Sequence, residues 1–152
     1  MSEKALGIAS NGKQMHYSVG ALIVKDGKYL LLDRRRKPYG FAGVAGHIEI
    51  GETPVEAIER KVKEESNLDS VTCQILFDEE VVWNDCSYGD FAHYWYLFKI
   101  NVDGTDFKLN EDEGKEMGWF TKEYIKRLNL EPVWRYWFEK LGIIKNENIA
   151  VS

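Results

Sequence analysis

A glycine-punctuated stretch that leads directly into a strong helix start most constrains the fold of this chain. Its glycines rule out a helix over residues 40–46, so a loop or a short strand is predicted there. Thr53, Pro54 and Glu56 then supply an N-cap residue, a proline at the first helical position and a glutamate three residues after the cap. These signals predict a helix over residues 54–66.

The segments on either side predict a sheet. Residues 19–24 and 29–32 are two apolar runs, and Asp26-Gly27 between them tolerates the positive φ angles of a hairpin turn. Strands and helices that follow without regular β-α-β alternation indicate an α/β fold with a mixed sheet. Runs rich in β-branched and aromatic residues, turn residues and helix starts predict later strands over 71–83, 91–102 and 115–120, a loop over 84–90, helices over 121–128 and 133–141, and a frayed end over 146–152.

Length, charge and cysteine content narrow the class of protein. A chain of 152 residues is expected to form one domain over residues 1–152. The net charge of −5 has the wrong sign for wrapping the backbone of long DNA or RNA. No apolar run reaches the length of a signal peptide or a membrane span. With two cysteines, the composition suits a reducing compartment, so we expect a cytoplasmic protein that binds neither long nucleic acid nor a membrane.

The predicted helix has an apolar face and an acidic edge. At about 100° per residue, Val55, Ile58 and Val62 share one narrow sector, which predicts the buried face. Glu64 and Glu65 project together from a neighbouring sector, and a hard divalent cation such as Mg²⁺ commonly relieves the repulsion between two such carboxylates. A solvated acidic edge is the commoner arrangement for an arbitrary pair. The glycine-rich loop upstream lets backbone groups approach a ligand, which favours a binding site.

The same segment resembles the Nudix box of the Nudix hydrolases, G-x5-E-x7-R-E-U-x-E-E-x-G-U, in which U is aliphatic. The resemblance implies a Nudix-type α/β/α sandwich with a mixed sheet. It also implies hydrolysis of a nucleoside diphosphate linked to another moiety, with Mg²⁺ or Mn²⁺ as the cofactor. Lys61 and Asn67 depart from the pattern, although asparagine tolerates the left-handed conformation that ends many helices. The residues that match are Gly46, Glu52, Arg60, Val62, Glu64, Glu65 and Leu68.

The resemblance also implies roles for individual residues. Glu64 and Glu65 would be metal ligands, and the backbone carbonyl of Ala45 is a candidate for another. Arg60 and Glu52 would orient these carboxylates through an ion pair without touching the metal. Metal ions in such a site neutralise the diphosphate and lower the pKa of an attacking water.

Residues before the box complete the predicted substrate site. Arg34 and Arg36 can contact phosphates as bidentate donors, although a solvated basic loop explains them equally well. Gly46 and His47 are predicted to lie against the substrate, because the glycine loop allows a close approach and the imidazole can reach a phosphate.

A catalytic base is sought in the acidic segment 111–116, just before Trp119 and Phe120. Glu116 is our candidate, together with Glu113, because the family often uses a glutamate from a later loop. A solvated acidic loop is an equally good explanation of these residues. His16 and His93 are expected to be structural or surface residues.

Lys61 stands where the family has a glutamate that joins the metal site or acts as the base. Two unit charges about 4 Å apart repel by about 4 kcal/mol at an effective dielectric of about 20, so an inward ammonium would weaken metal binding. The chain is therefore a hydrolase with its base supplied from elsewhere, or a catalytically impaired Nudix-fold module that binds a nucleotide as a sensor. A third alternative is an interaction domain whose acidic helix contacts a protein. The expected partner is a small nucleotide, and a homodimer stays open because the family frequently dimerises.

Overall fold

The computed structural model describes residues 3–84 and 91–145. The expected loop over 85–90 and the expected frayed end over 146–152 lie outside these residues. Within the described part of the chain, no helix is long and apolar enough to cross a membrane.

The predicted hairpin is present at the centre of the fold. Strand β2 (Gln14–Lys25) turns directly into β3 (Lys28–Arg34). Asp26 and Gly27 between them have φ angles of 51° and 75°, as a two-residue hairpin turn requires. The two strands pair only next to the turn, at Val24 with Tyr29 and Lys25 with Lys28, and then diverge. The hairpin prediction is confirmed, and its divergence opens the sheet for other partners.

Strand β2 organises the rest of the sheet. It runs parallel to β7 from the pair Met15–Ala92 to the pair Ile23–Ile100, and its other pairings are antiparallel, so the sheet is mixed as predicted. The glycine stretch forms two short strands rather than a helix, also as predicted. The remaining strands are β1 (Leu6–Ile8), which pairs with β2; β4 (Phe41–Ala42) and β8 (Gly114–Thr121), which pair with β3; β5 (Val44–His47), which pairs with β2; β6 (Asp69–Val81), which pairs with β7; and β7 (Ala92–Asp103).

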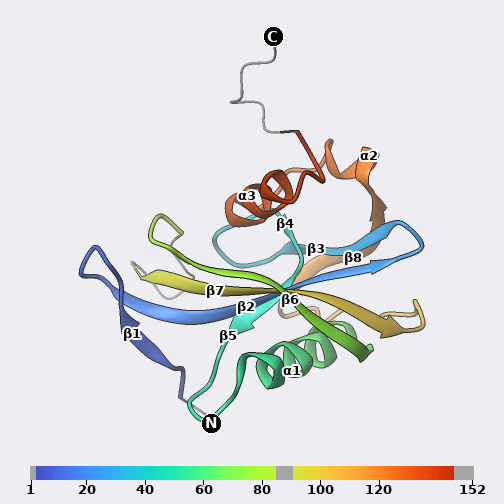
Figure 1. Cartoon of the computed structure of the whole chain (residues 1–152). Coiled ribbons are helices and arrows are strands. Elements are labelled where there is room, and N and C mark those ends of the chain that lie inside the picture. The colour runs from blue at the N-terminus through green and yellow to red at the C-terminus, as the bar shows by residue number, and fades with distance from the viewer. Residues whose placement is uncertain (1–2, 85–90, 146–152) are drawn as a thin grey trace.

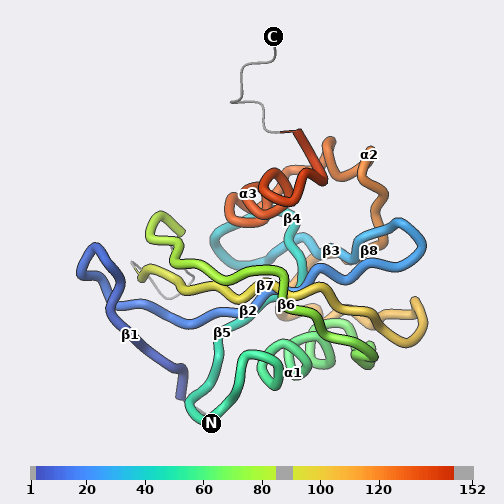
Figure 2. Tube along the Cα trace, in the orientation of Figure 1, coloured from blue at the N-terminus to red at the C-terminus, as the bar shows by residue number. Residues whose placement is uncertain are grey.

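Helices cover both faces of the sheet. Helix α1 (Pro54–Ser66) lies on one side, and α2 (Lys122–Ile125) with α3 (Pro132–Lys140) lies on the other (Figure 1 and Figure 2). The α/β/α sandwich is thereby confirmed. Helix α2 is shorter than the predicted 121–128, because the amides of Arg127 and Leu128 bond three residues back instead of continuing the helical ladder.

Helix α1 begins and ends as its sequence signals indicate. The Thr53 side chain accepts from the Glu56 amide at 3.1 Å, and the Glu56 carboxylate accepts from the Thr53 amide at 2.9 Å. This reciprocal pair is a capping box. Asn67 ends the helix with φ 61°, the left-handed conformation expected of it. The predicted bounds of 54–66 are confirmed.

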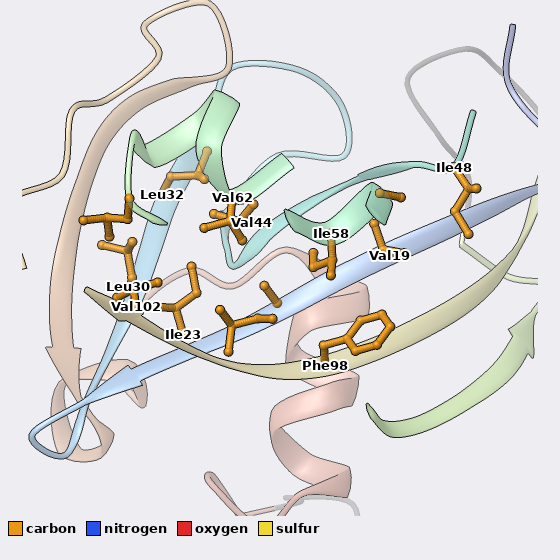
Figure 3. Packing of buried hydrophobic residues seen from close by; sticks show 14 residues of the cluster. Val19, Ile23, Leu30, Leu32, Val44, Ile48, Ile58, Val62, Phe98 and Val102 are labelled. Carbon is orange, nitrogen blue, oxygen red and sulfur yellow. The ribbon is translucent and has the colours of Figure 1, made fainter. Parts of the chain in front are cut away.

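The core between α1 and the sheet corrects one prediction. Ile58 and Val62 are fully buried against sheet residues that include Val19 and Val44 (Figure 3). Val55, which was predicted to share this face, is 43% exposed, so that prediction was wrong. Val55 lies in the first turn, and Ala57 is fully buried in the core instead.

The opposite layer depends on the glycine stretch. Trp134, Trp137 and Phe138 of α3 are almost fully buried in a second core. A Cβ atom on Gly43 would lie 2.6 Å from the Trp134 indole, so only glycine permits this close approach. The same stretch therefore contacts α3 through Gly43 and leads into α1.

Candidate active site

Arg60 ties helix α1 to the loop that precedes it. Its Nε donates to Glu52 Oε2 at 2.7 Å, and its Nη2 donates to Glu52 Oε1 at 2.9 Å and to the backbone carbonyl of His47 at 3.1 Å. This hydrogen bonding holds the pKa of Glu52 below its ordinary value and raises the pKa of Arg60. The predicted ion pair between Arg60 and Glu52 is present, and it fixes the strand β5 carbonyl in the same network.

Lys61 lies between the two carboxylates that were predicted to bind metal. Its Nζ is 3.5 Å from Glu64 Oε2 and 3.2 Å from Glu65 Oε1. The Glu65 side chain is 5% exposed and that of Lys61 is 14% exposed, whereas that of Glu64 is 47% exposed. Burial disfavours the charged form of Lys61, but the carboxylates of Glu65 and Glu113 outweigh it and raise its pKa. Burial also raises the pKa of Glu65 to about 7, although the ammonium opposes that shift.

The geometry of Lys61 tests whether a divalent cation fits the box. A Cβ on Gly46 would lie 2.3 Å from Lys61 Cε, so the lysine stem packs directly on the glycine loop. An ion bound by both Glu64 and Glu65 would have to share their oxygens with the ammonium, at a separation where two cations repel by several kcal/mol. Mg²⁺ or Mn²⁺ does not fit this arrangement while Lys61 keeps its position.

A cavity of about 220 Å³ lies beside the box. Its polar part holds five cationic side chains and three carboxylates, and its apolar part includes two indole rings. Strands β2, β3, β5 and β7, helix α1 and the start of α3 all contribute to it. The lining residues are Lys4, Ser18, Arg34, Arg36, Pro38, Ala45, Gly46, His47, Glu49, Arg60, Lys61, Asn84, His93, Trp95, Glu113, Glu131, Val133 and Trp134.

Most of the predicted site residues meet at this cavity. Arg34, Arg36, Ala45, Gly46, His47 and Arg60 all line it. Glu52, Glu64 and Glu65 are not among the lining residues and contact Arg60 or Lys61 instead. Glu116 is exposed on β8 and is not among the lining residues, whereas Glu113 is. Among the acidic-loop candidates, the structure therefore brings only Glu113 to the cavity.

Arg34 also contacts the backbone of its own loop, which its position in the sequence did not indicate. Its Nε donates to the carbonyl of Pro38 at 2.7 Å, and its Nη2 lies 3.3 Å from the carbonyl of Lys37. The guanidinium thus holds the loop after β3 together through contacts with two of its backbone carbonyls. Arg36, farther along that loop, also lines the cavity.

Glu131 is a cavity residue that sequence reasoning treated only as part of a helix start. It is the N-cap of α3, accepts from the Trp134 amide at 3.2 Å and is 3% exposed. Burial raises its pKa to about 7, with Arg34 opposing the shift. A glutamate before Pro132 signals a cap, but nothing local signals that the cap is buried at a cavity.

Trp95 and Asn84 are cavity residues that the sequence indicated without a motif. Trp95 is one of several aromatic residues that can stack on a base or lie in the core, and Asn84 begins a loop in which substrate specificity is expected. The Trp95 indole donates to Asn84 Oδ1 at 3.1 Å, and both residues line the cavity. The sequence left a stacking surface and the core as alternatives for the aromatic residues of β7, and the structure places Trp95 at the cavity. Trp95 lies next to His93 at a ring separation of 5.8 Å.

Comparison with known proteins identifies the family. The NUDIX domain model matches residues 14–141, so the chain belongs to the NUDIX family. The chain is 43% identical over 114 residues to an ADP-ribose pyrophosphatase of Methanocaldococcus jannaschii, a match that covers 73% of this chain and 64% of that protein. The chain thus spans somewhat less than two thirds of the length of this relative.

Solved structures with the same fold support this membership. A MutT protein from Methanosarcina mazei Go1 has a TM-score of 0.70 and 25% identity, covering 84% of this chain and 93% of that one. A MutT NUDIX hydrolase from Burkholderia pseudomallei has a TM-score of 0.71 and 20% identity, covering 85% and 99%, and this likeness shows the fold alone. The predicted Nudix membership and fold are confirmed.

Proposed function

We propose that this chain hydrolyses a phosphoanhydride bond in a nucleoside diphosphate linked to another moiety. The observation that carries the proposal is the cavity beside the box, where cationic side chains and indole rings line one space. Cationic side chains can bind a diphosphate, and indole rings offer a flat surface on which a base or a sugar face packs well. The similarity to an ADP-ribose pyrophosphatase supports ADP-ribose as the first substrate to test.

In this proposal, cationic residues bind the diphosphate and a carboxylate acts as the base. Arg36 and Lys4 neutralise the diphosphate, since both line the cavity, whereas the Lys61 ammonium is paired with Glu64 and Glu65. Arg60 keeps the β5 carbonyls in position through its bond to His47. Glu113 is the preferred base for an attacking water, because its carboxylate lines the cavity and that of Glu116 does not. A requirement for Mg²⁺ or Mn²⁺ is the part of the proposal that Lys61 opposes, so we assign no step of the reaction to either ion.

A second candidate is favoured by the position of Lys61. Because its ammonium satisfies Glu64 and Glu65, the chain can hold a phosphorylated ligand on cationic side chains without a resident metal. In that case the protein is a nucleotide-binding or sensor module with little turnover.

One experiment separates the two functions. The parent and the variants Lys61→Glu and Glu65→Gln are incubated with ADP-ribose and other nucleoside diphosphate derivatives, with Mg²⁺, Mn²⁺ or EDTA, and product nucleotides are quantified. Lys63→Glu is the matched control, because Lys63 lies on the same helix, is 53% exposed and pairs with Asp69 instead. Turnover by the parent that Glu65→Gln reduces at least about tenfold, with Lys63→Glu unchanged, supports the hydrolase.

Other outcomes are equally informative. Turnover that appears only in Lys61→Glu, together with stabilisation of the parent by ADP-ribose in a thermal melt, supports the binding module. If neither protein turns over any compound of the panel and none of them shifts the melting temperature, both functions are wrong.

We also propose a cytoplasmic location and leave the homodimer as a prediction. The composition and the two cysteines support the first, and the dimerisation frequent in the family supports the second. Light scattering of the purified chain measures the assembly directly.

A further inference from the structure

Three histidines from three strands converge beside the cavity. His16 of β2 and His93 of β7 are direct neighbours in the parallel register. His47 of β5 is aligned with Ser18, which is two residues along β2 and therefore on the same face as His16. One ring nitrogen of each histidine lies within 4.8 Å of the other two.

This cluster lies on the face of the sheet opposite to the box carboxylates. Val19, whose side chain alternates with those of His16 and Ser18, packs in the core under α1. Gly46, the neighbour of His47, faces Lys61 of the same helix. The histidines are therefore a separate group of potential ligands, although His47 and His93 line the same cavity.

We propose that His16, His47 and His93 form a binding site for Zn²⁺ or a similar borderline transition-metal ion. Imidazole nitrogens are preferred ligands of Zn²⁺, at about 2.0–2.1 Å in tetrahedral geometry. That geometry separates the nitrogens by about 3.3 Å and the ring centroids by about 5 Å. The observed centroid separations are 4.3, 5.6 and 6.1 Å. These separations bracket the value of that geometry, and one ring nitrogen of each histidine lies within 4.8 Å of the other two.

One of the rings is already oriented by its surroundings. His93 Nδ1 lies 2.6 Å from the backbone carbonyl of Asn84. A carbonyl oxygen only accepts, so Nδ1 carries the proton and Nε2 carries the lone pair that a metal needs. A backbone carbonyl on the far nitrogen of a metal-binding histidine is a recurrent arrangement that fixes the tautomer.

The cluster is largely buried. His16 is 5% exposed and His93 is 3% exposed. Desolvation, with the neighbouring imidazoles as a further cause, lowers the pKa of His47 to about 2, and desolvation lowers that of His93 to about 4.

The charges around the cluster indicate what completes the coordination. Lys4 and Lys61 act on His47 through their positive charge, which opposes a bare cation. An anionic oxygen from a ligand in the cavity would offset that charge and supply the fourth ligand. Three protein ligands with one open position is the arrangement of Zn²⁺ sites that bind a substrate or water. The chemical class of the fourth ligand is therefore a phosphate or carboxylate oxygen.

Cobalt substitution tests the site without reference to activity. Co²⁺ is titrated into the full chain, freed of metal by chelation, and visible absorption is recorded. We expect one equivalent to give the intense d–d bands of a four-coordinate ion, displaced by one equivalent of Zn²⁺ but not by a large excess of Mg²⁺. Each of His16→Gln, His47→Gln and His93→Gln is expected to weaken Co²⁺ binding at least about tenfold. Inorganic phosphate is expected to shift the bands, whereas chloride is not.

Matched variants and a second measurement test whether the histidines, and not the box carboxylates, bind the ion. Glu64→Gln and Glu65→Gln alter the box and leave the histidines in place, so both should keep the four-coordinate spectrum. Where a histidine variant does not fold, imidazole ¹⁵N shifts of the parent with and without Zn²⁺ replace it, and all three rings should move. A weak six-coordinate spectrum, loss of binding in Glu64→Gln rather than in the histidine variants, or imidazole shifts unchanged by Zn²⁺ overturns the proposal.

Discussion

Arg60 joins three parts of the site through one planar group. It bonds Glu52 twice, the carbonyl of His47 once, and lies 3.3 Å from Glu64. Lysine at this position keeps the charge but can reach only one of these groups at a time. Arg60→Lys is therefore expected to lower the free energy of unfolding by about 1–2 kcal/mol in urea denaturation.

The matched control for this change is Arg135→Lys. Arg135 is 44% exposed and lies 3.9 Å from Glu139 in a single surface pair. Such pairs contribute little, so this variant should stay within about 0.5 kcal/mol of the parent. Equal losses in the two variants would mean that the fork geometry of Arg60 is unimportant.

At the scale of the residue, sequence spacing predicted which side chains make contact but not how deeply each one is buried. Lys61 can meet Glu64 and Glu65 because residues three and four apart are neighbours on a helix, and both contacts are present. The burial of Glu65 at 4% exposure depends on what packs over it, including the chain around residues 108–110, whose amides bond Ser66 and Glu65 carbonyls. That packing is not local, so helical periodicity could not predict the burial of Glu65. For the same reason, periodicity wrongly placed Val55 on the buried face.

At the scale of the element, the end of α1 depends on one left-handed residue. Asn67 has φ 61°, and its amide donates to the carbonyl of Lys63 at 2.9 Å. Glycine and asparagine tolerate this conformation. Alanine does so less well, because its Cβ crowds the backbone and no polar side-chain group compensates. Asn67→Ala is expected to lower the free energy of unfolding by about 1 kcal/mol, and Asn67→Gly to leave it unchanged or slightly higher.

Asn129→Ala is the control for this element. Asn129 is exposed and is not among the described residues with positive φ. Its variant should show no measurable change in a thermal melt. A loss in Asn67→Gly as large as that in Asn67→Ala would place the effect in the asparagine side chain rather than in the backbone conformation.

Elements with local signals were predicted well, and their pairing was not. The capping box fixed the bounds of α1, and Asp26-Gly27 fixed the hairpin turn, because both signals lie within a few residues. The parallel pairing of β2 with β7 joins Met15 to Ala92, which are separated by about half of the chain. Nothing in either segment specifies that register, so the meeting of His16 with His93 could not be predicted.

At the scale of the whole molecule, the cavity is the feature that sequence reasoning recovered least. The box and the arginine loop were found from their residues, but Asn84, Trp95 and Glu131 come from segments with no motif. They meet because β7 lies beside β2 and the start of α3 contacts the glycine stretch, where the Glu131 amide donates to the Phe41 carbonyl at 2.9 Å. Tertiary arrangement, rather than local pattern, thus sets the composition of the cavity.

Glu131 connects this arrangement to the stability of the whole molecule. Its pKa is raised to about 7 in the folded chain, chiefly by burial, from an ordinary value of 4.5. The folded state therefore binds the proton more tightly than the unfolded state. The stability from this proton is fully present below pH about 4.5 and is lost as the pH rises toward about 7, by up to about 3 kcal/mol.

Glu131→Gln removes this titration while keeping a side chain of similar shape. Relative to the parent, the variant is expected to gain stability as the pH rises from 5 to 8, because the parent alone must bury a carboxylate there. Urea denaturation at several pH values measures this as a flatter dependence of the free energy of unfolding on pH. Glu123→Gln, at an exposed position on α2, should keep the slope of the parent. Parallel curves for Glu131→Gln and the parent would show that the carboxylate of Glu131 titrates alike in the folded and unfolded chain, and that burial at the cavity does not control its charge.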